Sequence, residues 1–180
     1  LSILNASILG NILYVSSGNA HNIFVDDVGN VYGVGLNTDG QLGLEDTTTR
    51  DRIEAINYWQ PFADMQEVES GATHTVFLKI DGSAWVVGDN DSGQLGDNTL
   101  NDTSTPIQVS DWFDVVHVSA GGNHTLFLRS DGTVWVTGRN TEGQLGLGNN
   151  ASISTPQQIP SLTDVSWIAA GENHSLFVKT

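Results

Sequence analysis

The sequence predicts an all-β fold made of β-propeller-type blades, each with four antiparallel strands. Three observations carry this prediction. A histidine recurs 53, 50 and 50 residues apart, at His21, His74, His124 and His174. A glycine follows 14 residues after each of the first three histidines, and Gly-Gln-Leu-Gly comes next, at 40–43, 93–96 and 143–146. A period of about 50 residues with several strand signals in each period is typical of a propeller or a β-solenoid.

The repeat organises residues 1–180 into a single domain with about three and a half repeats. Counted from the histidines, a partial unit covers 1–20, unit one 21–73, unit two 74–123, unit three 124–173 and a second partial unit 174–180. We find no linker, low-complexity tract or second domain in this pattern.

The first two strands of each unit flank the histidine. Apolar residues recur nine and six positions before it, which predicts strands near 12–16, 65–69, 115–119 and 165–169. After a glycine turn and the histidine, three large apolar residues come together at 23–25, 76–78, 126–128 and 176–178. A strand that is apolar on both faces is covered on both faces, as happens between neighbouring blades.

The third strand of each unit contains an aromatic residue at a fixed place. Tyr32, Trp85 and Trp135 each lie 11 residues after their histidine. This constant position favours packing between blades, with ligand stacking or photochemistry as the alternative. The Asp-Gly pairs at 81–82 and 131–132 predict two-residue hairpin turns of type I′ between the second and third strands.

The fourth strand is expected near 53–56, 105–109 and 155–159. In the last two units it opens with Thr-Pro, and proline at the start of a strand is typical of a sheet edge. Residues 3–6 occupy the same place ahead of His21. The chain would then contain 15 strands, and no segment has a helical pattern.

The repeated histidines and glycines are interpreted as structural. Metal binding or catalysis by the four histidines is the alternative, but equivalent atoms of adjacent blades lie beyond the roughly 2 Å reach of a metal ligand. We expect each histidine to bond to loop backbone and to hold the turn before it. The glycines of the Gly-Gln-Leu-Gly loops should permit compact turns; they are Gly40, Gly43, Gly93, Gly96, Gly143 and Gly146.

One loop suggests a metal. Asp89-Asn90-Asp91-Ser92-Gly93 resembles a calcium-binding loop, which makes Asp89 and Asp91 weak calcium candidates. Equivalent loops in the other units carry different residues and no suitably placed glutamate follows. We therefore favour a solvated acidic turn, with no metal and no cofactor.

Composition limits the classes of partner. The formal charge of −15 disfavours nucleic acid and anionic membranes, and no apolar run approaches the roughly 18 residues of a membrane span. The chain has no cysteine. No phosphate loop, nucleophile elbow or metalloprotease motif is present, so we do not expect an enzyme. Leu1–Leu9 lacks a basic start, so we expect a mature chain or a portion of a longer one.

Some aromatic and basic residues are candidates for an interface. Trp59 falls in a three-residue insertion beside Tyr58. Tyr14 and Trp167 occupy a position where the other units have Glu67 and His117. Exposed tryptophan and tyrosine are preferred anchors of protein interfaces, with partial burial as the alternative. Three basic residues also share one position and could bind carboxylates or simply keep strand ends soluble; they are Lys79, Arg129 and Lys179.

The repeat resembles that of the regulator of chromosome condensation family. The matching stretches are Ala-Gly-Gly-Asn-His-Thr-Leu at 120–126, Asp-Gly-Thr-Val-Trp at 131–135, and Gly-Arg-Asn at 138–140 leading to Gly-Gln-Leu-Gly-Leu-Gly at 143–148. The resemblance covers essentially the whole chain. It implies a propeller that usually has seven four-stranded blades, whereas 180 residues suffice for about half of one.

These observations predict a non-enzymatic binding or assembly module. Incomplete blades at both ends predict head-to-tail association with further copies of the chain, as a ring or a filament. One alternative is a protein inhibitor of an enzyme, because a bacterial β-lactamase inhibitor resembles this fold. Another is a guanine-nucleotide exchange factor, the founding activity of the family. Partners are then the chain itself or another protein, and the acidic, Thr/Asn-rich composition weakly suggests an extracellular or cell-surface location.

Overall fold

The computed structural model describes residues 10–59, 64–109, 112 and 114–180, and these form four consecutive sheets. Blade one contains β1 (Ile12–Ser17), β2 (His21–Asp26), β3 (Val31–Gly35) and β4 (Arg50–Ala55). Blade two contains β5 (Met65–Ser70), β6 (His74–Lys79), β7 (Ala84–Gly88) and β8 (Thr103–Gln108). Blade three contains β9 (Val115–Ala120), β10 (His124–Arg129), β11 (Val134–Gly138) and β12 (Ile153–Gln158). The two-stranded blade four contains β13 (Val165–Ala170) and β14 (Ser175–Lys179).

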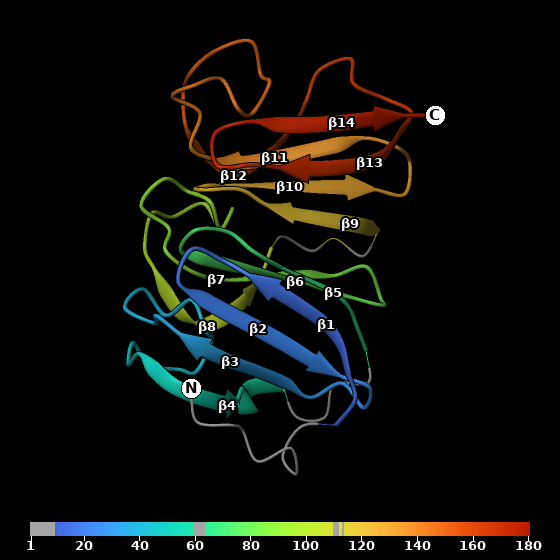
Figure 1. The fold of residues 1–180 in the computed structure, drawn as a ribbon. Coiled ribbons are helices and arrows are strands. Elements are labelled where there is room, and N and C mark those ends of the chain that lie inside the picture. Colours follow the sequence, from blue (N-terminus) through green and yellow to red (C-terminus); the bar gives the residue numbers. More distant parts are fainter. Residues whose placement is uncertain (1–9, 60–63, 110–111, 113) are drawn as a thin grey trace.

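The sheets are antiparallel, and each follows the order of its strands in the chain. They succeed one another from blue to red in Figure 1. The first strands of neighbouring blades, β1, β5, β9 and β13, contact each other, so they line a common axis. The all-β, propeller-type prediction is therefore confirmed, while the strand expected at 3–6 lies outside the described residues. Among the described residues, no helix has the length and apolar character needed to cross a membrane.

Each first strand has a β-bulge at the same place. In blade two the pairing runs from Met65 with Lys79 directly to Glu67 with Leu78, and the other blades repeat this shift. A bulge inserts one extra residue and so changes which face the following side chains occupy. This is why Met65 and Val68, three residues apart, are both buried on one face.

The hairpins between the second and third strands differ from the predicted type I′ turn. Gly82 donates its N–H to the carbonyl of Lys79, and Lys79 donates its N–H to the carbonyl of Ser83. Gly82 has a φ of 79°, whereas Asp81 has no positive φ. The loop therefore has three residues, a turn closed by a left-handed glycine and its bulge, because only the glycine tolerates that φ readily.

The fourth strands begin earlier than predicted. β8 starts at Thr103, so Pro106 is its fourth residue and falls where the ladder shifts between the pairs Val86–Ile107 and Gly88–Thr103. At a bulge on an edge strand no backbone N–H is needed for the ladder, so proline, which has none, is tolerated there. The insertion of unit one forms a 3₁₀ turn, η1 (Asn57–Trp59), which the sequence pattern did not predict.

The hydrophobic core lies between blades. Three buried clusters each join residues of two successive blades, and Phe77 and Phe127 are fully buried in the first and second. Trp85 packs against the first cluster and Trp135 against the second, both partly buried, while Tyr32 is buried and donates its hydroxyl to Asp26 Oδ2 at 3.0 Å. The recurrent aromatics therefore contribute to packing within and between blades.

The Gly-Gln-Leu-Gly loops join the third and fourth strands of each blade, and the first two of them pack against the next blade. Their leucines are fully buried. A Cβ on Gly40 would lie 2.5 Å from Ser104 Cα, and one on Gly43 would lie 3.1 Å from Pro106 Cγ, both in the following blade. Gly40 and Gly43 also have positive φ, as do their counterparts in the next two loops. Glycine at these positions permits both the backbone conformation and the close approach.

Candidate functional site

The repeated histidines form contacts between blades rather than with the loop backbone predicted from the sequence. His21 Nε2 lies 3.0 Å from Thr75 Oγ1, and Thr75 donates its hydroxyl to the carbonyl of Gln41 at 2.8 Å. His74 and His124 repeat this arrangement with hydroxyls of blades three and four. Because the hydroxyl proton is already donated, the histidine Nε2 must be the donor in each pair. The backbone prediction was wrong because the partner lies one blade away.

Burial keeps these histidines uncharged. It lowers the pKa of His21 and His124 to about 4, and that of His74 to about 3. Their Nδ1 atoms are buried and have no hydrogen-bond partner among the described residues. A neutral ring that donates from Nε2 leaves Nδ1 unprotonated, which fits this absence. Their role in this fold is to join blades.

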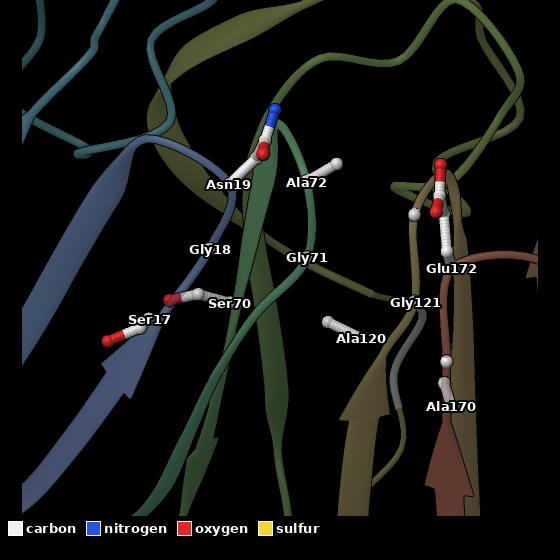
Figure 2. Close-up of a pocket in the computed structure, with 12 residues that line it drawn as sticks. Ser17, Gly18, Asn19, Ser70, Gly71, Ala72, Ala120, Gly121, Ala170 and Glu172 are labelled. Carbon is white, nitrogen blue, oxygen red and sulfur yellow. The ribbon is translucent and has the colours of Figure 1, made fainter.

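The glycine turns beside the histidines enclose a cavity on the axis. The cavity has a volume of about 370 Å³. Figure 2 shows the turns that line it, with Gly18, Gly71 and Gly121 labelled. Ala72 donates its N–H to carbonyls of the next turn, and Gly122 repeats this contact toward Glu172. A Cβ on Gly121 would lie 2.2 Å from His124 Cε1, although its φ is outside the left-handed region. The close approach of the His124 ring therefore requires glycine at position 121. We interpret these turns as packing contacts between blades.

The calcium candidates do come together. The ligand oxygens of Asp89, Asp91 and Asp102 lie within 4.8 Å of one another, the one such group of acidic, histidine or cysteine side chains found in the described part of the chain. Asp89 already accepts hydrogen bonds from Thr73 Oγ1 and Asn123 Nδ2, at 2.7 and 3.1 Å. These contacts support a hydrogen-bonded acidic turn.

We therefore expect calcium to have no effect on stability. Millimolar calcium, or a chelator, should leave the melting temperature of the chain unchanged within about 1 °C, because an ion that binds only the native state must raise it. Thermal unfolding followed by circular dichroism provides the measurement, with magnesium as the control ion. A rise of several degrees with calcium alone would contradict this prediction.

The residues seven positions before each repeat histidine form one row across the four inner strands. They are Tyr14, Glu67, His117 and Trp167. The four residues occupy equivalent places on β1, β5, β9 and β13 and line one cavity of about 440 Å³. Tyr14 is 38% exposed and Trp167 56%. The ring of His117 lies 4.0 Å from that of Trp167, with 35° between their planes. The side chains of Tyr14 and Trp167 are thus exposed, which the interface prediction requires.

Electrostatics distinguish two carboxylates in this cavity. Glu67 accepts hydrogen bonds from His117 Nδ1 and from the N–H of Val118, at 2.8 and 3.1 Å. Burial alone would lower the pKa of His117, but the hydrogen bond and charge of Glu67 raise it overall. Burial, and next the charge of Glu67, raise the pKa of Glu69 to about 7. No sequence pattern pointed to Glu69, because its neighbours in space come from other blades.

The three basic residues predicted to share one row have different surroundings. Arg129 forms an ion pair with Asp114, with Nη2 2.6 Å from Oδ2, and its guanidinium lies 5.5 Å from the ring centres of both Trp112 and Trp135. Lys79 has a partner as well, and Lys179 is exposed. The ion pair of Arg129 reduces its availability to bind an external carboxylate.

The inserted aromatics are placed only in part. Tyr58 is 43% exposed and has a contact within the chain. The backbone of Trp59 ends the 3₁₀ turn η1, and its side chain is outside the described structure. Their role at an interface stays a prediction.

The two outermost blade faces expose apolar residues that are buried elsewhere. Val15 of blade one is 59% exposed, whereas Val68 at the equivalent place of blade two is 4% exposed. Leu176 and Val178 of blade four are 60% and 55% exposed, while their equivalents in blades one to three are buried. These faces could be predicted from the repeat, because the position of each strand relative to the histidine defines which side chains meet the next blade.

The fold and its repeated contacts between blades define a repeat protein of the propeller class. Residues 28–78, 81–128 and 131–178 match the family model described as the regulator of chromosome condensation (RCC1) repeat, and a second model of this repeat matches 66–94 and 115–144. The chain belongs to the RCC1 repeat family.

Relatives and solved structures agree with this assignment. The chain is 34% identical over 93 residues to the X-linked retinitis pigmentosa GTPase regulator of Mus musculus, covering 52% of this chain and 9% of that protein. It is 35% identical over 92 residues to the secretion-regulating guanine nucleotide exchange factor of Bos taurus, covering 48% and 18%. Prp20p from Saccharomyces cerevisiae superposes with a TM-score of 0.83 at 19% identity, covering 94% of this chain and 44% of that chain. The chain thus spans less than half of each of these proteins.

Proposed function

We propose that this chain is a non-enzymatic protein-interaction module that associates head-to-tail with further copies of itself. The observation that carries the proposal is the exposure of Val15, Leu176 and Val178 at positions that are buried in interior blades. Among the structural neighbours, Prp20p binds Gsp1p and histones, and a yeast RCC1 structure shows it bound to Kap60. Protein binding by one protein of this fold supports an interaction role for this chain.

The shape of the two faces supports a second copy as the occupant. Within the chain, the face of β2 packs against the next blade through Ile23 and Val25, which are the equivalents of Leu176 and Val178. The opposite face of blade one carries Val15 and the half-buried Phe24. Their equivalents in blade two, Val68 and Phe77, pack on Ile23 and Val25 of blade one. Burial of apolar area of this kind gives about 25 cal/mol per Å². The two faces differ, so their contact is head-to-tail and leads to a ring or a filament.

Leu176→Asp should abolish most of this association. A carboxylate placed in a buried apolar contact costs several kcal/mol, so the dissociation constant should rise at least about tenfold. Leu100→Asp is the matched control, because Leu100 is 59% exposed and lies in a loop away from both faces. Sedimentation velocity of the 180-residue chain across micromolar concentrations provides the measurement.

A mixing experiment tests the head-to-tail geometry. Leu176→Asp retains an intact first face, and Val15→Asp retains an intact last face. Each variant alone should be monomeric, and an equimolar mixture should form a 1:1 dimer that grows no further. A wild-type chain that remains monomeric at these concentrations would contradict the proposal, as would a mixture that fails to pair while wild type associates.

The other sequence-based alternatives stay predictions. Inhibition of an enzyme is tested with a panel of purified β-lactamases. Exchange activity is tested by nucleotide release from a small GTPase at catalytic amounts of the chain, an assay that the likeness to a guanine nucleotide exchange factor makes worthwhile. The extracellular location, and the absence of enzymatic activity, likewise await measurement.

A further inference from the structure

The axial cavity lined by the four inner strands has properties of a binding site, and of the residues proposed for the terminal faces only Val15 also lines it. It has a volume of about 440 Å³, which is within the range of small-ligand sites, and residues of all four blades line it. Its walls combine apolar side chains such as Leu13 and Val116 with the carboxylates of Glu67 and Glu69 and the rings of Tyr14 and Trp167.

The charge of Glu69 is compensated only in part, by the charge of His117, which already pairs with Glu67. Glu67 is held by His117 and by the N–H of Val118, so its charge is compensated within the fold. By contrast, no group in the described ranges donates a hydrogen bond to the carboxylate of Glu69, which also faces the negative charge of Glu67. A half-buried carboxylate in this position gains free energy when a cation approaches it.

The aromatic rings favour a particular kind of cation. Trp167 contacts His117 on part of its surface, but more than half of it remains exposed, and Tyr14 is exposed on the opposite side of the row. A guanidinium stacks on aromatic faces and binds a carboxylate through paired N–H groups, whereas an ammonium is a compact and strongly hydrated charge. The net charge of −15 also attracts basic partners to the molecule.

We propose that this axial cavity binds an arginine side chain of a partner protein, with the guanidinium on Glu69 and between the rings of Tyr14 and Trp167. The site needs no contact at the terminal faces. The Leu176→Asp variant should therefore bind arginine as wild type does, and Glu69→Gln should leave self-association unchanged. These two variants distinguish a failure of the self-association proposal from a failure of the arginine-binding proposal.

The test is titration calorimetry of the full chain with the capped peptide acetyl-Gly-Arg-Gly-amide. The peptide should bind, and replacement of arginine by citrulline, its neutral isostere, should weaken binding at least about tenfold because the charge contact is lost. Glu69→Gln and Trp167→Ala should each have an effect of similar size. The lysine peptide should bind more weakly than the arginine peptide.

Two controls separate a built site from general attraction between opposite charges. Asp51→Asn removes an exposed carboxylate outside the cavity and should leave the affinity unchanged. Circular dichroism of Glu69→Gln checks that the variant remains folded. The proposal is overturned if the citrulline peptide binds equally well, if Glu69→Gln has no effect while folded, or if Asp51→Asn weakens binding as much as Glu69→Gln.

The dependence on pH provides a second readout. Below pH 7 the affinity for arginine should fall, approaching tenfold per pH unit as Glu69 becomes protonated. The other titratable groups that line the cavity are Glu67, His117 and Tyr14. Despite burial, the hydrogen bond to Glu67 raises the pKa of His117, and the charge that its ring gains as the pH falls also disfavours a bound cation. An affinity independent of pH between 5 and 7 would contradict the assignment to Glu69.

Discussion

Acidification from pH 7 to pH 4.5 should lower the free energy of unfolding by several kcal/mol. Three interior histidines carry this effect, because burial lowers the pKa of His21 and His124 to about 4 and that of His74 to about 3. Once unfolded, a histidine has a pKa of about 6.5. Below pH 6.5 the unfolded chain therefore binds more protons at these residues, and stability falls by up to about 1.4 kcal/mol per pH unit for each.

Glu69 and His117 act in the opposite direction, as does Asp102, whose pKa is raised mainly by burial. The pKa of Glu69 is about 7 in the folded chain, so the folded state binds the extra proton and Glu69 favours folding as the pH falls toward 4.5. His117 has a raised pKa, and its contribution is complete below pH 6.5 and is lost only as the pH rises. The three histidines outweigh Glu69 and Asp102 over this range, and salt near 0.15 M limits general repulsion among the acidic residues.

Urea unfolding at several pH values provides the measurement. His74→Gln should reduce the slope of stability against pH by about one proton between pH 6.5 and 4.5, whatever its effect on stability at pH 7. His117→Gln, which removes the histidine of the axial row, should leave the slope in this range unchanged. A flat profile for wild type would show that the histidines are accessible to protons in the folded state.

The sequence predicted the blades well because their strongest constraints are local and repeat. Glycines, apolar triplets and the histidine recur at fixed positions, so strand order and most strand positions followed from spacing. The apolar positions nine and six before each histidine are three residues apart, a spacing that simple alternation on a strand does not allow. That odd spacing was the signal for the bulge in β1, β5, β9 and β13, and through it for the row of side chains on the axis.

The contacts that sequence reasoning missed are those that join different blades. The acceptor for His74 is Thr125, 51 residues away, and the partner of Glu67 is His117, 50 residues away. A single sequence does not show which residues of neighbouring blades lie opposite each other. We therefore predicted a bond to the nearby loop backbone for each histidine. The same reason applies to Glu69, whose significance depends on residues that three other strands bring to it. A residue with a hydroxyl group directly follows each of the last three histidines, at Thr75, Thr125 and Ser175. This recurrence was the signal for the hydrogen bond between blades.

Phe127→Ala should lower the free energy of unfolding by about 3–5 kcal/mol, the usual cost of removing a fully buried phenylalanine. Phe127 is completely buried between blades two and three, and its ring lies 5.9 Å from that of Trp112 in an edge-to-face contact. Denaturant unfolding of the chain at low concentration measures the loss. A cost below about 1 kcal/mol would mean that the blades separate without this contact.

Phe24→Ala provides a matched control for the same chemistry at the outer face. Phe24 occupies the equivalent position in blade one but is only half-buried. In monomeric chain its removal should therefore cost clearly less than that of Phe127, because less of the ring leaves water on folding. At concentrations where copies associate, the proposed contact covers this face, so the cost of Phe24→Ala should rise toward that of Phe127→Ala while the cost of Phe127→Ala stays constant. Equal costs at low concentration would show that the first face is already covered within the single chain.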